Sequence, residues 1–200
     1  MTETVHVPGG RRVVGSLDAP EADAVVVACP PHPQHGGSRS DRRLRAVGDA
    51  LAPEGACLRI DYGSWDEGRG ECVDAENALA WAADRYDAVG LFGYSFGAAV
   101  ALRAIADLDA GAPATPQCCS VLAPPAGLTD QQDVVEAVDS VRCPLQVVYG
   151  GRDETVDWEP VVERARERDH RVDSVPAGHQ FAGQTGRVAA LVADFLAASL

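Results

Sequence analysis

Short runs of apolar, mostly β-branched residues alternate along the chain with longer Ala-rich stretches in which apolar residues recur at helical spacing. Continuous hydrophobicity is typical of strands covered on both faces by helices, and the alternation indicates a parallel sheet wound with crossover helices. We expect buried strands over residues 24–28, 56–60, 88–92, 120–122, 145–149 and 171–175. The helical spacing predicts helices over residues 40–51, 72–85, 96–106, 158–167 and 186–198.

Two further segments define the predicted domain. Residues 5–7 and 12–16 flank a Pro-Gly-Gly turn, so we expect them to pair as an antiparallel hairpin. Between Thr129 and Val141 there is room for only a short helix or loop, whereas a lid domain would need more residues. Without internal repeats or a long linker, residues 1–200 are predicted to form one α/β domain with little or no lid.

The segment Gly93-Tyr94-Ser95-Phe96-Gly97 lies between a predicted strand and a predicted helix. A G-x-S-x-G pattern alone is weak evidence, but the strand–turn–helix context is what a nucleophile elbow requires. Glycines on both sides remove the Cβ atoms that would clash in so sharp a turn. We therefore predict that Ser95 is a nucleophile; the alternative is an ordinary serine cap of the helix.

A serine nucleophile needs a base, and the base needs a carboxylate to orient it. His179 follows the last predicted strand, and Asp153 follows strand 145–149 and a Gly-Gly turn. Loops after parallel strands gather at one edge of the sheet, which is also the edge expected for Ser95. We predict Ser95, His179 and Asp153 as a catalytic triad, with Asp157 as the alternative carboxylate.

An acyl-transfer site also needs hydrogen-bond donors for the oxyanion that forms on the substrate. The backbone N–H of Phe96, directly after the serine, is the expected first donor. The second is expected from the loop 29–37, in which prolines at three positions have no N–H to donate. Gln34 is our first choice in this loop and His35 the second. Three aromatic residues are predicted to wall an apolar acyl pocket: Trp65, Tyr94 and Phe181.

Composition limits the partners of the protein. Asp and Glu total 30 against 17 basic residues, which gives a formal net charge of −13. Such a surface repels nucleic acid and anionic membranes, so we expect neither as a partner. The predicted triad instead indicates a small acyl compound as the substrate. No apolar run reaches the length of a membrane span, and the N-terminus lacks the pattern of a secretory signal. We predict a cytoplasmic location.

Cysteine and histidine spacing gives no sign of a metal site. The six cysteines include no C-x-x-C pair, and we expect reduced thiols that fill space in the core. His32 and His35 stand three residues apart, without a carboxylate or thiol arranged beside them. The predicted mechanism requires neither a metal nor an organic cofactor.

In their order along the chain, the motifs resemble those of the α/β-hydrolase superfamily. More narrowly, the chain is similar to a short, cap-less, dienelactone-hydrolase-like branch of serine hydrolases. The resemblance covers roughly residues 24–200. It is carried by Pro31-His32-Pro33 with Gly36-Gly37, Asp61-Tyr62-Gly63-Ser64, Gly70-Glu71 with Asp74, Gly93-Tyr94-Ser95-Phe96-Gly97, Asp153, and Gly178-His179-Gln180-Phe181.

The resemblance implies an α/β-hydrolase fold: a mostly parallel central sheet flanked by helices on both faces. It implies a triad of Ser95, Asp153 and His179, with an oxyanion hole formed by Phe96 and the loop around Gln34. We expect hydrolysis of a small carboxylic ester or thioester through an acyl-enzyme. The alternatives are an acyltransferase or peptidase with the same triad, and a non-catalytic binding protein on a hydrolase fold.

Three features depart from that branch. Pro30 stands where a histidine is common, and Asp61 stands where Arg or Asn is more frequent. Dienelactone hydrolases proper use a cysteine nucleophile, so the resemblance does not imply a lactone substrate.

The charged residues are also biased in kind. All 17 basic residues are Arg, and Asp outnumbers Glu by 19 to 11. With abundant Ala and Val, this composition resembles that of proteins from salt-loving microbes. The alternative is a GC-rich genome, which favours Arg and Ala without any role for salt.

We expect the unfolding temperature and the activity to climb steeply between about 0.1 and about 2 M KCl. The Debye length is about 10 Å at 0.1 M and about 3 Å at 1 M, so salt removes most of the repulsion among exposed carboxylates. Thermal melts across that range measure the effect. A flat melting temperature would favour the GC-rich genome as the cause.

Overall fold

The computed structural model describes residues 1–200 except residues 53, 110 and 130–131. The strands of its main sheet are β1 (Thr2–Val7), β2 (Val13–Asp18), β3 (Ala24–Cys29), β4 (Ala56–Asp61), β5 (Ala88–Tyr94), β6 (Cys118–Leu122), β9 (Leu145–Gly150) and β10 (Arg171–Val175). A small second sheet pairs β7 (Gly127–Thr129) with β8 (Gln132–Asp133). The α-helices are α1 (Arg42–Leu51), α2 (Arg69–Ala83), α3 (Phe96–Asp107), α4 (Val134–Val138), α5 (Glu159–Glu167) and α6 (Thr185–Ala197), and η1 (Pro33–His35) is a 3₁₀ turn.

The main sheet has the strand order β1-β2-β4-β3-β5-β6-β9-β10. The six strands from β4 to β10 in this order run parallel, whereas β2 is antiparallel to both β1 and β4. The predicted parallel sheet and N-terminal hairpin are therefore confirmed. Each predicted strand and long helix is present, with ends that differ by a few residues.

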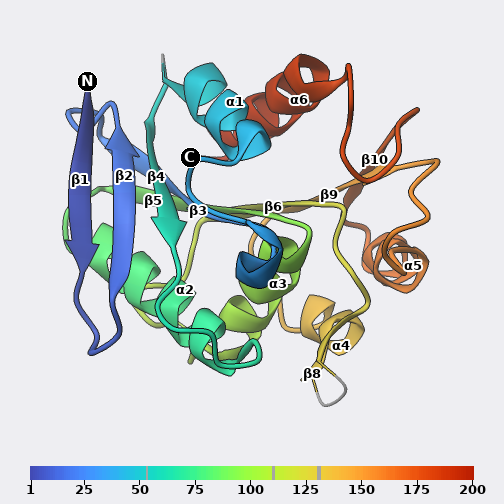
Figure 1. Ribbon diagram of the computed structural model, residues 1–200, viewed down its shortest axis with the longest axis horizontal. Coiled ribbons are helices and arrows are strands. Elements are labelled where there is room, and N and C mark those ends of the chain that lie inside the picture. Colours follow the sequence, from blue (N-terminus) through green and yellow to red (C-terminus); the bar gives the residue numbers. More distant parts are fainter. Residues whose placement is uncertain (53, 110, 130–131) are drawn as a thin grey trace.

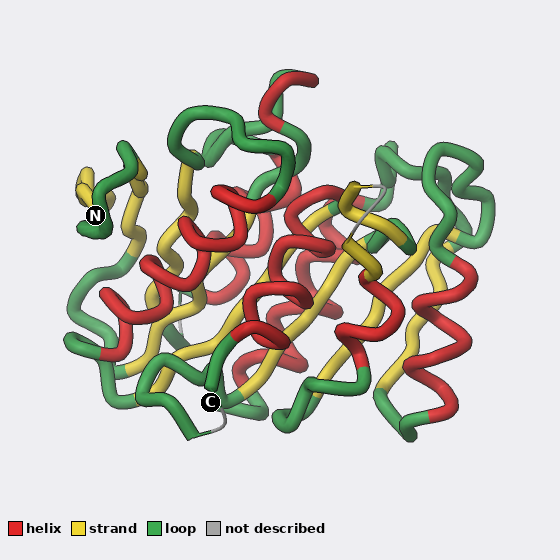
Figure 2. The backbone as a smooth tube through the Cα atoms, turned by 90° about the horizontal axis from the view of Figure 1, so that it is seen from below, coloured by secondary structure: helices red, strands yellow, loops and turns green. Residues whose placement is uncertain are grey.

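Helices cover both faces of the sheet. α1 and α6 lie together on one face, and α2, α3, α4 and α5 lie on the other (Figure 1). Figure 2 shows the chain from below, with helices lying over the strands. Consecutive residues of β3 enter opposite cores: Val25 and Val27 pack on the side of α2 and α3, and Val26 and Ala28 on the side of α1 and α6. The continuous hydrophobicity of the central strands reflects this burial on two faces.

The stretch between β6 and β9 is short, as predicted. Its described residues form β7, β8 and the five-residue helix α4, and residues 130–131 lie outside the described part of the chain. These elements include no separate cap domain over the sheet edge. Within the same described residues, no helix is both long and apolar enough to cross a membrane.

Candidate active site

The turn between β5 and α3 holds Ser95 in a backbone conformation that non-glycine residues seldom adopt, with φ 56° and ψ −121°. The Ser95 N–H donates to the carbonyl of Leu122 on the neighbouring strand at 2.8 Å. A Cβ atom on Gly93 would lie 2.2 Å from the carbonyl oxygen of Gly97, and one on Gly97 would lie 2.2 Å from that of Cys29. Both glycines of the motif are therefore required by close backbone contacts.

The structure brings Ser95, His179 and Asp153 into one hydrogen-bonded line. Ser95 Oγ lies 2.8 Å from His179 Nε2, and His179 Nδ1 lies 2.7 Å from Asp153 Oδ2. The other oxygen of Asp153 accepts the N–H of Thr155 at 2.9 Å. Asp157, the alternative carboxylate, is exposed, and the imidazole Nδ1 is paired with Asp153 instead.

The loops after β9 and β10 meet through direct backbone contacts. A Cβ atom on Gly150 would lie 2.5 Å from the carbonyl oxygen of Ala177. Two residues after Gly150, the N–H of Arg152 donates to the same carbonyl of Ala177 at 3.0 Å. Two loops that are distant in sequence are thus fixed to each other, and they carry Asp153 and His179.

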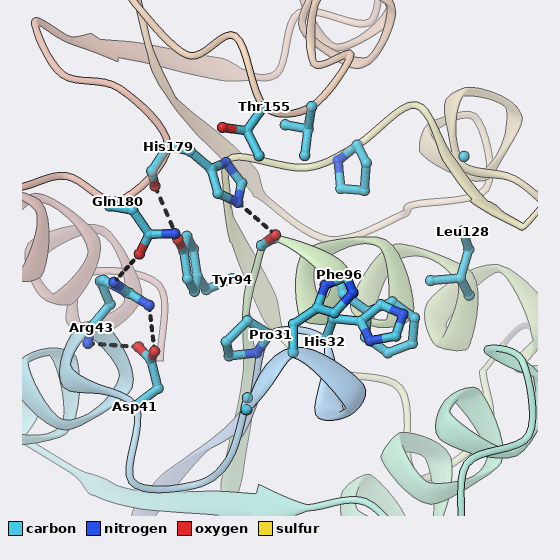
Figure 3. A pocket seen from close by; sticks show the side chains of 17 residues that line it. Pro31, His32, Asp41, Arg43, Tyr94, Phe96, Leu128, Thr155, His179 and Gln180 are labelled. Carbon is cyan, nitrogen blue, oxygen red and sulfur yellow. Dashed lines mark hydrogen bonds and ion pairs between the residues drawn. The ribbon is translucent and has the colours of Figure 1, made fainter.

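Ser95 and His179 open onto a pocket of about 520 Å³ at the carboxyl edge of the sheet (Figure 3). One side of the pocket is mainly apolar and the other is polar. Asp41, Arg43 and Gln180 lie together on the polar side, and Phe96 and Leu128 lie on the other side (Figure 3). Pro31, Pro125 and Val156 add further apolar surface to the lining.

The loop after β3 does not present Gln34 to this pocket, which corrects our choice of second oxyanion donor. The N–H of Gln34 donates to His32 Nδ1 at 3.3 Å, and Gln34 is absent from the pocket lining. The N–H of His35, the second choice, donates to the carbonyl of His32 at 3.0 Å. The 3₁₀ turn therefore uses both donors internally. The backbone N–H groups of His32 and Phe96 have no acceptor among the described residues.

Of the three aromatic residues predicted to wall the pocket, only Tyr94 lines it. Trp65 lies one layer behind, with its ring 4.6 Å from that of His32 and 5.6 Å from that of Phe96. Phe181 is completely buried in the core on the side of α1 and α6. Burial raises the pKa of Tyr94 to about 12, so the hydroxyl stays protonated at neutral pH. It donates a hydrogen bond to the carbonyl of His179.

Two buried carboxylates that the sequence analysis did not interpret hold the loop that carries Trp65. Glu71 accepts the N–H groups of residues 66 and 68, at 3.0 and 2.8 Å. Asp74 accepts the N–H of Gly63 at 2.8 Å and Arg11 Nε at 2.7 Å. Both carboxylates are fully buried. Their spacing of one helical turn on α2 was the available signal for a shared anchoring role.

The cysteines lie away from the pocket lining. None of the six is among the pocket-lining residues, and five are buried. Burial raises the pKa of the Cys29 thiol, the one closest in sequence to the loop after β3, to about 12. Thiols of this kind stay protonated at neutral pH and are poor nucleophiles.

A family model described as "Dienelactone hydrolase family" matches residues 64–198. The chain belongs to the dienelactone hydrolase family. Membership makes the protein an enzyme of the hydrolase class, and the matched segment contains Ser95, Asp153 and His179. No curated protein matches the chain.

Several solved structures share the fold of this dienelactone hydrolase family member. An esterase from Pyrococcus furiosus is 20% identical, with a TM-score of 0.81 over 98% of this chain and 90% of its own. An α/β serine hydrolase homologue from Coxiella burnetii is 22% identical (TM-score 0.80; 98% and 97% covered). A dienelactone hydrolase from Anabaena variabilis is 23% identical (TM-score 0.79; 100% and 98% covered). These likenesses confirm the predicted α/β-hydrolase fold.

We expect His32 to make the stability of this family member depend on pH. Burial, and then the neighbouring His35, lowers the pKa of His32 below its ordinary value of 6.5. The unfolded chain therefore takes up this proton at higher pH than the folded chain, and stability falls as the pH drops below about 6.5. Protonated His32 Nδ1 also cannot accept the N–H of Gln34.

Thermal melts between about pH 7.5 and about pH 5 test this expectation around the ordinary histidine pKa. His32→Asn should lose less stability on acidification than the unmodified protein. His6→Asn, at an exposed position of β1, is the matched control and should keep the original pH dependence. Equal acid sensitivity of His32→Asn and the unmodified protein would contradict the assignment.

Proposed function

We propose that this protein is a serine hydrolase that cleaves a small carboxylic ester or thioester through an acyl-enzyme. The observation that carries the proposal is the unbroken hydrogen-bonded line from Ser95 through His179 to Asp153, beside an open pocket. A triad is recognised by such geometry rather than by sequence position. The strained backbone of Ser95 supports the same role, because strain of this kind is concentrated at functional sites.

In the proposed mechanism, Ser95 Oγ attacks the acyl carbon while His179 Nε2 takes the hydroxyl proton. Asp153 holds the Nδ1–H of the imidazole and stabilises the imidazolium that forms. The imidazolium then gives its proton to the departing alkoxide or thiolate, leaving an acyl-enzyme. Water attacks this ester with His179 again as base, and the free acid leaves as Ser95 recovers its proton.

The oxyanion is proposed to accept hydrogen bonds from the backbone N–H groups of Phe96 and His32. Two features support this pair: both residues line the pocket, and neither N–H has an acceptor among the described residues. Phe96 is also the first residue of α3, where the helix dipole favours negative charge. Preorganised donors of this kind are worth roughly 10²–10³ in kcat each.

Ser95→Ala should abolish ester turnover and labelling by a fluorophosphonate, because both require Oγ as the nucleophile. We expect kcat for p-nitrophenyl acetate to fall by about 10⁴-fold or more. Stopped-flow or steady-state release of p-nitrophenol measures the loss, and circular dichroism checks that the fold is retained. Near-normal turnover and labelling would reject the mechanism.

Asp153→Asn should lower kcat/KM by about 10⁴-fold, because an amide in this position favours the wrong imidazole tautomer. Asp157→Asn is the matched control: it makes the same chemical change four residues away, and we expect it to leave the rate within about threefold. Rates are compared on one p-nitrophenyl ester. The reverse ranking of the two variants would assign the carboxylate role to Asp157.

A further inference from the structure

The polar side of the pocket contains a buried arginine that the proposed chemistry does not use. Arg43 is only 7% exposed, and its guanidinium lies over the ring of Tyr94 with Cζ 4.3 Å from the centroid. One amino group donates to Gln180 Oε1 at 2.9 Å, and the other forms an ion pair with Asp41 (Figure 3). Three neighbours from three segments thus fix the plane of this guanidinium.

These contacts converge on the segment 178–181, which carries His179. The hydroxyl of Tyr94 donates to the carbonyl of His179 at 3.0 Å. Arg42, the neighbour of Arg43 on α1, donates to the carbonyl of Gln180 at 2.9 Å. Arg43 holds both the side chain of Gln180 and the ring that bears the Tyr94 hydroxyl. The start of α1 and the end of β5 therefore both hold the segment 178–181 in place.

We propose, resting on the function proposed above, that Arg43 is a positioning residue that holds His179 in line with Ser95 through Gln180 and Tyr94. Because its charge is paired with Asp41 inside the protein, the pocket accepts electrically neutral acyl groups rather than anionic ones. The inference thus names a class of substrate as well as a role for the residue.

The charge balance of the pocket supports the neutral substrate class. Among the described lining residues, Asp41 and Arg43 are the only Asp, Glu or Arg residues, and their charges cancel. Arg43 Nε has no hydrogen-bond partner among the described residues, but it is shut off from solvent and so is not presented to a ligand. The carboxylate of Asp153 and the net charge of −13 further oppose the entry of an anion.

The position of the Arg43–Asp41 ion pair at the start of α1 also supports a role inside the protein. Asp41 is the N-cap of α1 and accepts the N–H of Arg43 at 2.8 Å, while its other oxygen meets the guanidinium. A cation in the first turn of a helix is normally unfavourable, because that end carries partial positive charge. The fixed carboxylate of Asp41 compensates for this, which is consistent with a role inside the protein for Arg43.

Two p-nitrophenyl esters that differ in charge distinguish a positioning residue from an anion receptor. The neutral probe is p-nitrophenyl acetate and the anionic probe is mono-p-nitrophenyl succinate. We expect the unmodified protein to prefer the neutral ester in kcat/KM. Arg43→Met should lower kcat on both esters by about 10- to 100-fold, the scale of a misplaced catalytic group, and leave the ratio of the two kcat values within about threefold. Arg43→Lys, which keeps the charge without the planar fork, should recover part of the loss.

A second pair of variants tests whether Arg43 acts through its partner. Gln180→Ala should lower kcat on both esters. In the Arg43→Met background the same change should lower kcat by a smaller factor than it does in the unmodified protein, because the two side chains form one contact. Arg45→Met, an exposed arginine on the same helix, is the matched control and should keep the original rates. Thermal melts show whether a variant that loses activity is still folded. If Arg43→Met does not fold, the effects of Gln180→Ala and Arg43→Lys on kcat provide the test.

Clear outcomes would overturn the inference. A loss in Arg43→Met that is confined to the succinate ester and appears in KM would make Arg43 an anion receptor. Preference of the unmodified protein for the anionic ester, or full additivity of the Arg43 and Gln180 changes, would also reject it. Failure to hydrolyse either ester, together with absent fluorophosphonate labelling, would instead reject the proposed function.

Discussion

The site depends on one close approach of two backbone segments. Gly97, at the start of α3, packs against the end of β3 so tightly that a Cβ atom would lie 2.2 Å from the carbonyl oxygen of Cys29 and 2.5 Å from that of Pro30. Any side chain at this position would separate the turn of Ser95 from the loop that contains His32. The two N–H groups proposed as oxyanion donors belong to the two segments that meet here, so the distance between them depends on the absence of a side chain at Gly97.

The other half of the site is built in the same way. Gly150 allows the backbone of the loop after β9 to approach Ala177 in the loop after β10. The Asp153–His179 hydrogen bond links the side chains of the same two loops. The two halves are then joined through Tyr94, which belongs to the strand that leads to Ser95 and holds the carbonyl of His179. Packed backbones of this kind resist deformation, which favours a preformed arrangement of Ser95, His179 and Asp153.

Sequence reasoning found the parts of the structure that depend on period and strand order. Continuous apolar runs located the strands, and the rule that loops after parallel strands share an edge brought together Ser95, Asp153 and His179. The prediction of Gln34 as an oxyanion donor was wrong, because its N–H is used in a local hydrogen bond to His32 Nδ1. Sequence reasoning also failed for Phe181 and Trp65, since the side of a loop that faces solvent depends on packing partners distant in sequence.

The acidic composition acts differently inside the protein and on its surface. The buried carboxylates Glu71, Asp74 and Asp153 each accept hydrogen bonds from backbone N–H groups, so they serve as anchors for loops. Salt screens exposed charges far more than buried ones, and these anchors are shielded from it. Repulsion among surface carboxylates therefore acts on the stability of the whole domain, whereas the local geometry around His179 is set by short, buried contacts. A change in ionic strength should move the fraction of folded protein before it moves the arrangement of the site.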